Sequence, residues 1–335
     1  MVMTSSARSA PAPLHLVGRF EVPYSGACLE LLAMRDQLAT RRPVECWSVT
    51  PPHALYARQG VKAIRPFASQ FPRGGVLYWG GAHVPPDVWL KYARFDRVML
   101  HVNLASYARL FALFAILHDT TSIEPELVFV SESLRLTAGL QGQVLYSPIN
   151  TEPLLSIADT RWDGDGRRLP VTVGRVSRDV LDKHHPQDPW IYRMLVAAGH
   201  SVRIMGGTCL ASELGDVEGV ELLPEGSQPV ADFYKSLDIF FYRTGSTVEA
   251  YGRVVAEAMA TGLPVVAENR GGYVEVIDPG VTGCLVQSQE QAWDTLEALA
   301  TDVALRRRIG VAASADIRRF HGAEALSASL DRLEL

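Results

Sequence analysis

The chain has 335 residues, 47% hydrophobic and 21% charged, which is typical of a folded soluble protein and long enough for two domains with separate cores. A net charge of -5 gives no basic surface for binding a phosphate polymer, so nucleic acid is not an expected partner. The four cysteines show no C-x-x-C spacing, which argues against a disulfide framework or a zinc site and fits a reducing cytoplasm.

The first segment, residues 1–12, contains small polar residues and prolines without an apolar stretch, so a flexible tail is predicted rather than a secretory signal. Further along, the apolar run Leu110–Leu117 is far shorter than the roughly 20 residues that a membrane span requires. We expect a core helix there, with an acceptor-facing or lipid-facing surface as the alternative. The expected location is the cytoplasm, with peripheral contact at the inner face of the membrane left open.

Residues 13–155 alternate short apolar runs with amphipathic helical patterns. The predicted strands lie within residues 14–20, 44–49, 75–81, 97–103, 127–133 and 144–150. This alternation predicts an α/β, Rossmann-like domain with a mostly parallel sheet and helices on both faces. Residues 150–169 are polar and rich in turn-forming residues, which predicts a linker to a second domain.

The same rhythm returns in residues 165–319, where a second Rossmann-like domain with roughly six parallel strands is predicted. The predicted strands lie within residues 169–176, 201–207, 220–225, 238–244, 264–267 and 283–286. Ligands of such sheets bind outside the carboxyl ends of the strands, and two doubly wound domains facing each other would enclose an interdomain cleft. The last helix, residues 320–335, is expected to pack back on the first domain.

The stretch "STVEAYGRVVAEAMATGLPVV" places two glutamates, Glu249 and Glu257, eight positions apart. A helix is predicted from about Gly252 to Thr261, ended by Gly262. Free N–H groups and the dipole at the start of this helix favour a phosphate. Carboxylates beside a phosphate need uncharged hydrogen-bond donors, and sugar hydroxyls are such donors. A nucleotide sugar combines both chemical groups.

A simpler interpretation of these residues stays open. Arg253 and Glu257 are spaced i, i+4, and as a helix pair they would contribute about 0.2–0.5 kcal/mol to stability. Glu249 would then be a solvated loop residue. The spacing alone favours this interpretation.

Longer stretches resemble a known family. "EAYGRVVAEAMATGLPVVA" and "GGYVEVIDPGVTGCLV" resemble the E-x7-E region of retaining nucleotide-sugar glycosyltransferases of family 4, which have the GT-B fold of two facing Rossmann-like domains. "VGRVSRDVLDKHHP", "LVFVSESL" and "VLYSPIN" resemble other parts of that family. The resemblance covers most of the chain, is strongest over Val173–Val286 and is weak before Leu77. It implies transfer of a hexose-type sugar from a nucleoside-diphosphate sugar to a hydroxyl acceptor, often in polysaccharide or glycoconjugate biosynthesis.

The resemblance also implies roles for individual residues in the second domain. Glu249 is expected to bind the transferred sugar and Glu257 the ribose, while Arg175 and Lys183 neutralise the leaving diphosphate. Arg178 lies between these two cations and is expected to share or replace the part of Arg175, with a surface charge as the alternative. Further donor-binding candidates are Tyr251, Gly252, Arg253, Gly206 and Gly207.

Two candidates lie in the first domain. His101 matches the active-site histidine of the family and is expected to hydrogen-bond a sugar hydroxyl, although a lone histidine is more often structural. Gly26 is expected to let the backbone approach donor or acceptor closely, with a simple turn before a helix as the alternative.

No metal or other cofactor is expected besides the nucleotide-sugar substrate. Asp163 and Asp165 form a D-G-D sequence, but it lies among glycines in the predicted linker and is interpreted as a turn. His184 and His185 lack a third ligand at a metal-binding spacing. The diphosphate is therefore expected to be neutralised by protein charge alone.

Two other functions stay open. A nucleotide-sugar epimerase of GT-B architecture would need acid and base groups around the sugar ring. A non-catalytic donor-binding subunit of a polysaccharide assembly complex would keep the fold without turnover. The expected partners are a nucleotide-sugar donor and a saccharide or lipid-linked saccharide acceptor. The base, the sugar and the acceptor are not identified by the sequence.

Overall fold

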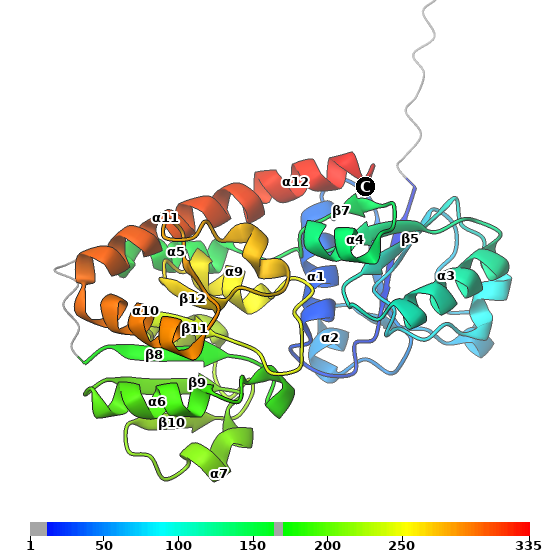
Figure 1. The fold of residues 1–335 in the computed structure, drawn as a ribbon. Coiled ribbons are helices and arrows are strands. Elements are labelled where there is room, and N and C mark those ends of the chain that lie inside the picture. Colours follow the sequence, from blue (N-terminus) through cyan, green and yellow to red (C-terminus); the bar gives the residue numbers. More distant parts are fainter. Residues whose placement is uncertain (1–11, 164–169) are drawn as a thin grey trace, which may run out of the picture. The chain divides into compact units, whose positions relative to one another are not determined.

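The computed structural model describes residues 12–163 and 170–335, and the chain divides into two compact α/β units, each built on its own parallel sheet (Figure 1). Unit 1 comprises the described residues up to Val130 together with Arg135–Pro148 and Ser327–Leu335, and unit 2 comprises Ser131–Leu134 and Ile149–Leu326. The predicted fold class, two parallel-sheet α/β domains, is confirmed.

The sheet of unit 1 has the strand order β3-β2-β1-β4-β5-β6-β7. Its strands are β1 (Leu14–Gly18), β2 (Val44–Ser48), β3 (Lys62–Ala63), β4 (Val76–Trp79), β5 (Arg97–Val102), β6 (Glu126–Phe129) and β7 (Gln143–Val144). Every residue of β1 and β4 is buried, as expected for a parallel sheet covered on both faces. The strand order reverses between β1 and β4, which makes their carboxyl ends the expected ligand position.

The helices of unit 1 follow from apolar spacing along the chain. They are α1 (Gly26–Leu38), α2 (Ala54–Arg58) and α3 (Tyr107–Thr121), with the short 3-10 helices η1 (Pro66–Ala68) and η2 (Val88–Tyr92). α1 packs on β1 and β2 (Figure 1). α3 buries Leu110, Leu113 and Leu117 and exposes Phe111 and Ile116, so the apolar run is only partly a core helix.

Two helices contain residues of both units: α4 (Glu132–Ala138) and α12 (Ala323–Arg332). At the end of α12, the backbone carbonyl of Leu333 accepts a hydrogen bond from Arg97 of β5. Ser327–Leu335 belong to unit 1, whereas α11 before them belongs to unit 2. Among the described helices, none combines the length and the hydropathy that crossing a bilayer requires.

The sheet of unit 2 has the strand order β10-β9-β8-β11-β12-β13, in agreement with the predicted number of strands. Its strands are β8 (Thr172–Val176), β9 (Ser201–Met205), β10 (Val220–Leu223), β11 (Ile239–Tyr242), β12 (Val265–Glu268) and β13 (Cys284–Val286). Side chains alternate between the faces, so Ile239 and Phe241 join one core while Phe240 stacks on Tyr242. The order reverses between β8 and β11.

Helices cover both faces of this second sheet. They are α6 (Asp188–Ala197), α7 (Ala211–Leu214), α8 (Val230–Lys235), α9 (Arg253–Ala260), α10 (Gln289–Thr301) and α11 (Val303–His321), with η3 (Leu181–Lys183), η4 (Thr208–Leu210) and η5 (Gly272–Val276). α9 packs against β11, β12 and α11, while α6 contacts β9 and α10 (Figure 1). The helix predicted from about Gly252 begins at Arg253, with Gly252 as its N-cap.

The predicted linker, residues 150–169, needs correction. Most of its described part is the helix α5 (Glu152–Arg161), which buries Leu154, Leu155 and Ile157. The Arg161 guanidinium donates to backbone carbonyls of unit 2, so the helix belongs to that unit and the boundary lies at residues 148–149. Turn-forming residues hid the short apolar face of the helix. Residues 1–11 of the predicted tail, and Asp165, lie outside the described part of the chain.

Candidate functional site

The reversal of strand order in unit 2 defines where its ligand is expected. β8 and β11 are hydrogen-bonded neighbours, and their continuing connections run in opposite directions across the sheet. Open α/β sheets bind ligands at the carboxyl ends of such a pair. The loops at this point are residues 177–184 after β8 and residues 243–252 after β11, and they carry Lys183 and Glu249.

Lys183 and Glu249 form an ion pair at this position. The Lys183 Nζ lies 2.7 Å from Glu249 Oε1, and the Tyr242 hydroxyl donates to the same oxygen over 2.6 Å. Burial raises the pKa of Tyr242 well above its ordinary value, so the phenol stays a proton donor at neutral pH. The side chains of the ion pair are 12% and 16% exposed, which leaves both within reach of a ligand.

Glycines hold the loop that carries Glu249. The Gly272 N–H donates to the Glu249 carbonyl over 2.9 Å, and a Cβ on Gly272 would lie 2.1 Å from the Ala250 carbonyl oxygen. Gly252 has a φ of +85°, and a Cβ there would lie 2.4 Å from the Tyr273 ring. Larger residues would displace this loop, so the glycines fix the backbone position of Glu249.

The Glu257 side chain, on α9, contacts Tyr234 of α8 and Arg253 of α9. The Tyr234 hydroxyl donates to Glu257 Oε2 over 3.1 Å, and Arg253 Nη2 lies 3.6 Å from Oε1. Both charged side chains are 13% exposed. The helix pair of the simpler interpretation therefore exists, and it still leaves part of each charge accessible. Tyr251 is buried and its hydroxyl is bonded to His321, so its side chain is used within the protein.

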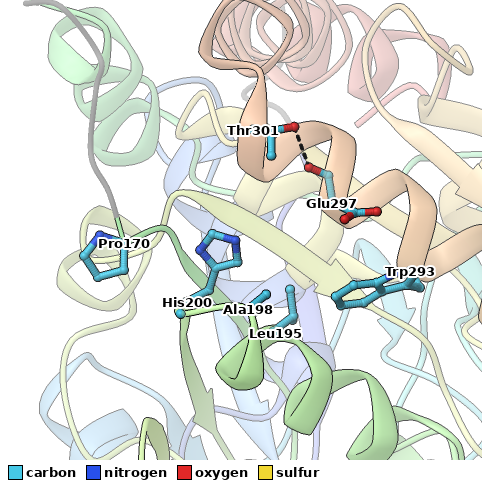
Figure 2. A pocket seen from close by; sticks show the side chains of 8 residues that line it. Pro170, Leu195, Ala198, His200, Trp293, Glu297 and Thr301 are labelled. Atoms are coloured by element: carbon cyan, nitrogen blue, oxygen red, sulfur yellow. Dashed lines mark hydrogen bonds between the residues drawn. The ribbon is translucent and has the colours of Figure 1, made fainter.

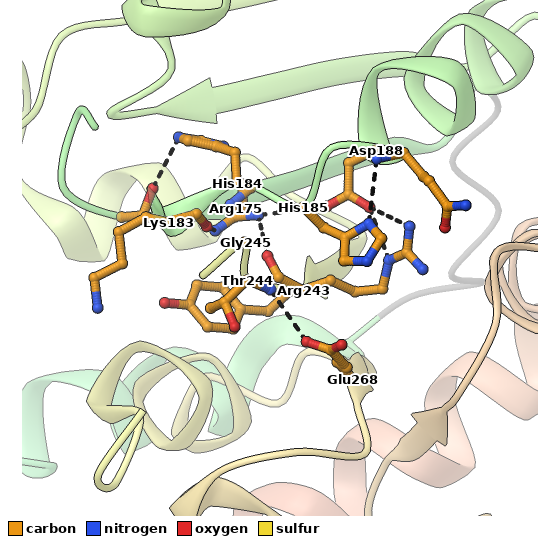
Figure 3. Close-up of polar contacts among 12 residues, drawn as sticks. Arg175, Lys183, His184, His185, Asp188, Arg243, Thr244, Gly245 and Glu268 are labelled. Atoms are coloured by element: carbon orange, nitrogen blue, oxygen red, sulfur yellow. Dashed lines mark hydrogen bonds and ion pairs between the residues drawn. The ribbon is translucent and has the colours of Figure 1, made fainter. Parts of the chain in front are cut away.

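Arg175 corrects the sequence interpretation. The side chain is completely buried, and its guanidinium donates to the backbone carbonyls of Arg243 and Lys183 (Figure 3). In this position the guanidinium is enclosed by protein, whereas the resemblance implied contact with a diphosphate. Arg178 follows on the same loop and is exposed, so it is the arginine that a ligand can reach.

Asp188 and Arg243 are two residues of this region that the sequence interpretation missed. Asp188 Oδ1 accepts from Arg243 Nε over 2.8 Å, and Asp188 Oδ2 lies 3.6 Å from Arg175 Nη1. Burial raises the pKa of Asp188 to about 6 against the opposing effect of the two guanidinium groups. The available signal was an arginine directly after a fully apolar strand, at Arg243.

Gly206 and Gly207 follow β9; Gly206 packs against the loop after β8, whereas a Cβ on Gly207 would meet Ile204 of β9. Gly206 has a φ of +82°, and a Cβ there would lie 1.9 Å from the Ser177 carbonyl oxygen. The His184 ring Nε2 lies 2.9 Å from the Gly206 carbonyl, and burial lowers the pKa of His184 to about 4, so a neutral ring donates this bond. These contacts give Gly206 and His184 a structural part in the site.

A metal site finds no support among the described residues, where no group of three His, Cys, Asp or Glu side chains lies close enough to hold an ion. Asp163 is exposed just after α5.

In unit 1, His101 also requires a correction. It lies inside β5 and is fully buried, with Nδ1 2.7 Å from the Tyr78 hydroxyl and Nε2 3.1 Å from Glu30 Oε2. Both ring nitrogens are used within the protein here, whereas the resemblance implied a hydrogen bond to a sugar hydroxyl. Glu30 also accepts from Ser147 and Asn103, which makes this buried carboxylate the centre of the network.

Asn103 follows β5 and is the residue of this network that lies beyond the strand end. Its Nδ2 donates to Glu30 and to the Gly80 carbonyl, while Oδ1 has no hydrogen-bond partner among the described residues. A Cβ on Gly81 would lie 2.5 Å from that oxygen. Gly26 is the first residue of α1, after β1, so it lies at the strand-order reversal of unit 1. The sequence interpretation missed Glu30 and Asn103.

A hollow elsewhere in unit 2 lies at the wrong end of the sheet for a substrate. Figure 2 shows its lining, which includes Pro170 before β8, His200 before β9 and Trp293 of α10. Because the strands are parallel, these residues mark their amino ends. Lys183 and Glu249 lie at the carboxyl ends, so the hollow is separate from the candidate site.

Comparison with known proteins identifies the kind of fold. Residues 195–316 match the family Glycosyl transferases group 1, a segment that contains Glu249 and Glu257 but not Lys183. A crystal structure of HepE from Anabaena in complex with UDP and glucose has a TM-score of 0.70 at 14% identity, covering 96% of this chain and 98% of that one. This likeness shows the GT-B fold, and together the two comparisons support a glycosyltransferase.

Curated relatives are similar over part of their length. The D-inositol 3-phosphate glycosyltransferase of Xylanimonas cellulosilytica is 34% identical over 152 residues, which are 44% of this chain and 36% of the relative. The capsular polysaccharide biosynthesis glycosyltransferase CapM of Staphylococcus aureus is 27% identical over 150 residues, 41% of this chain and 39% of the relative. The matched segments thus span well under half of these relatives.

Proposed function

We propose that the chain is a retaining glycosyltransferase that moves a hexose-type sugar from a nucleoside-diphosphate sugar to a hydroxyl acceptor, in the biosynthesis of a polysaccharide or glycoconjugate. One observation carries the proposal. Lys183 and Glu249 are paired at the strand-order reversal of unit 2, and Glu257 lies on the helix that follows. A cation for phosphate and carboxylates for hydroxyls are what a nucleotide sugar needs at one place.

In the proposed reaction, the bond between the sugar and the diphosphate breaks and leaves negative charge on the diphosphate. Lys183, Arg178 and the N–H groups at the start of α9 stabilise that charge, so no metal is needed. Glu249 accepts hydrogen bonds from the transferred sugar, and Glu257 accepts them from the ribose. The acceptor oxygen forms the new bond on the face that the diphosphate leaves, and its proton passes to a diphosphate oxygen.

The acceptor is proposed to be a saccharide or a lipid-linked saccharide. For the lipid-linked case, Phe111 and Ile116 of α3 offer exposed apolar side chains for peripheral membrane contact.

The donor can be found by thermal unfolding with UDP, GDP and ADP and their hexose conjugates. A ligand at 100 times its Kd adds about 2.7 kcal/mol to the free energy of unfolding, which gives a clear shift in Tm. UDP-glucose is the first donor to test, because HepE was crystallised with UDP and glucose. A Tm that none of these compounds raises would contradict the proposed donor class.

Turnover is tested next by hydrolysis of the stabilising donor without an acceptor, followed by NMR. The released sugar is expected to appear first as the anomer present in the donor. The opposite anomer would reject the retaining mechanism. Donor binding without hydrolysis or transfer would instead favour the non-catalytic donor-binding subunit, and an epimerised sugar still attached to the nucleotide would favour the epimerase.

A further inference from the structure

The interior of unit 2 holds a charged cluster that no ligand contact accounts for. It consists of Arg175 at 0% exposure, Asp188 at 0% and Arg243 at 3%. Two guanidinium groups share one carboxylate, so the cluster keeps one positive charge when Asp188 is ionised. Burying charge is costly unless specific contacts compensate for it, which raises the question of what these side chains hold in place.

Arg175 links the two loops of the candidate site. Its Nη1 donates to the Arg243 carbonyl over 2.7 Å, and its Nη2 donates to the carbonyl of Lys183 (Figure 3). The guanidinium also lies 4.6 Å from the centre of the Tyr242 ring, and Tyr242 is the phenol that donates to Glu249. Arg175 therefore touches the backbone of one member of the ion pair and the partner of the other.

The two loops are packed closely enough for this link to determine their spacing. A Cβ on Gly245 would lie 2.7 Å from the His184 carbonyl oxygen and 3.2 Å from that of Asp182. From the other side, Arg270 donates to the carbonyls of Thr244 and Gly245 over 2.8 and 2.7 Å. The loop after β11 is thus clamped between Arg270 and the segment that carries Lys183.

We propose that Arg175 is a positioning residue that acts on the reaction through Lys183, while Asp188 and Arg243 hold Arg175 in place. This inference rests on the proposed function, and it assigns contact with the diphosphate to Lys183 and the exposed Arg178. A shift of the Lys183 loop by about 1 Å would be enough to lower turnover by about 100-fold.

A double-mutant cycle separates positioning from direct contact. Arg175→Gln should lower kcat/KM by about 10- to 100-fold in the wild-type background. In a Lys183→Ala background the same change should have little effect, because the residue through which Arg175 acts is already gone. Equal losses in both backgrounds would show that Arg175 acts independently of Lys183 and would overturn the proposal.

Arg306 provides a matched control for loss of a buried arginine. It is 3% exposed and donates to the backbone carbonyls of Leu299 and Ala300, which lie at the end of α10. Arg306→Gln should lower Tm as Arg175→Gln does, yet leave kcat/KM of the folded protein within about twofold of wild type. A loss of kcat/KM as large as that of Arg175→Gln would reduce Arg175 to a general stability role.

Two further variants keep the test informative if Arg175→Gln does not fold. Arg175→Lys retains the charge but cannot donate to both carbonyls with the planar geometry of a guanidinium. Gly245→Ala removes no charge and pushes against the loop that carries Lys183. Both variants should lower kcat/KM in the wild-type background and have little further effect with Lys183→Ala; wild-type activity in both would overturn the proposal.

Amine labelling reports on Lys183 without any need for turnover. Acetic anhydride should label Lys183 several-fold faster in Arg175→Gln than in the wild type or in Arg306→Gln, with the exposed Lys235 as internal reference. Unchanged labelling of Lys183 would overturn the inference. A wild type that neither binds nor turns over any nucleotide sugar would instead overturn the proposed function, and the labelling comparison would still decide whether Arg175 positions Lys183.

Discussion

Unit 1 and unit 2 both bury ionisable side chains where their strand order reverses, but the buried clusters are built around different groups. In unit 1 the carboxylate of Glu30 accepts from His101, Asn103 and Ser147. In unit 2 two guanidinium groups surround Asp188. The same topology thus supports one carboxylate that meets several hydrogen-bonding side chains in unit 1 and two guanidinium groups around a carboxylate in unit 2, so the fold provides the position and the side chains provide the chemistry.

The largest expected effect comes from breaking the positive cluster. Asp188→Asn leaves two buried guanidinium groups without their carboxylate and should lower the free energy of unfolding of unit 2 by about 3–5 kcal/mol. Glu30→Gln in unit 1 keeps an acceptor for neutral donors and should lower it by only about 1–3 kcal/mol. Urea unfolding of both variants measures the difference. Equal losses would mean that removing the carboxylate charge costs the same beside two guanidinium groups as it does in the Glu30 cluster.

The accessible carboxylates of unit 2 should separate into two roles. Glu249→Ala should lower kcat by about 100-fold with a small change in donor affinity, because its contacts serve the reacting sugar. Glu257→Ala should mainly weaken donor binding, because the ribose does not change during the reaction. Steady-state kinetics and calorimetry test both, with the half-exposed Glu221→Ala as control. Wild-type activity in the double variant would restore the simple helix pair of Arg253 and Glu257.

Acid sensitivity should arise in unit 2. Burial lowers the pKa of His321 to about 3 and that of His184 to about 4, so below pH 6.5 the unfolded chain binds more protons at these residues than the folded one. Their stabilising effect is therefore complete above pH 6.5 and falls as pH decreases, by about 1.4 kcal/mol per pH unit for each histidine. Asp188, with a pKa raised to about 6, has the opposite effect. Between about pH 6 and 4 the folded chain binds one more proton at Asp188 than the unfolded chain, which offsets the loss of stability caused by one histidine.

This pH dependence can be checked with single variants. His321→Gln should reduce the slope of the free energy of unfolding against pH between 6.5 and 5, whereas the exposed His118→Gln on α3 of unit 1 should leave it unchanged. Denaturant unfolding at a series of pH values gives both slopes. Identical slopes in wild type and His321→Gln would show that His321 is not buried as a neutral ring.

The smallest expected effect is that of metal removal. Unit 2 offers Lys183, Arg178 and the start of α9 for the diphosphate, so exhaustive EDTA treatment should leave the initial rate of donor hydrolysis unchanged. Adding magnesium or manganese should not raise it. If the rate disappears with EDTA, returns with metal and is lost in Asp163→Ala or Asp165→Ala, the roles proposed for the cations of unit 2 are wrong.

Much of the fold could be predicted because buried parallel strands appear in the sequence as apolar runs. β8, β9, β11 and β12 all lie within or within one residue of predicted strands, and α9 differs from its predicted bounds by one residue at each end. α5 was missed because its apolar face is short and its surroundings are polar. The local spacing of apolar residues therefore predicted the elements with the clearest periodicity, but it did not predict a short helix flanked by turn-forming residues.

The site was less predictable because burial depends on distant residues. The position of Arg175 is determined by contacts with Asp188 and Arg243, which lie 13 and 68 positions further along the chain, and no local motif shows them. The sequence predicts His101 at a strand end, but β5 continues to Val102, and Asn103 is the first residue beyond it. A shift of one or two residues at a strand end changes which side chain a ligand can reach.

The most direct test of the central claim is whether the strand-order reversal of unit 2 binds a diphosphate through Lys183. Calorimetry should compare a nucleoside diphosphate with its monophosphate, using the base that gives the largest Tm shift, on wild type and on Lys183→Ala. We predict that wild type binds the diphosphate at least about tenfold more tightly and that Lys183→Ala loses this preference, since a charge-assisted hydrogen bond contributes about 1.5–3 kcal/mol. An equal preference in both proteins, or none in wild type, would contradict the account.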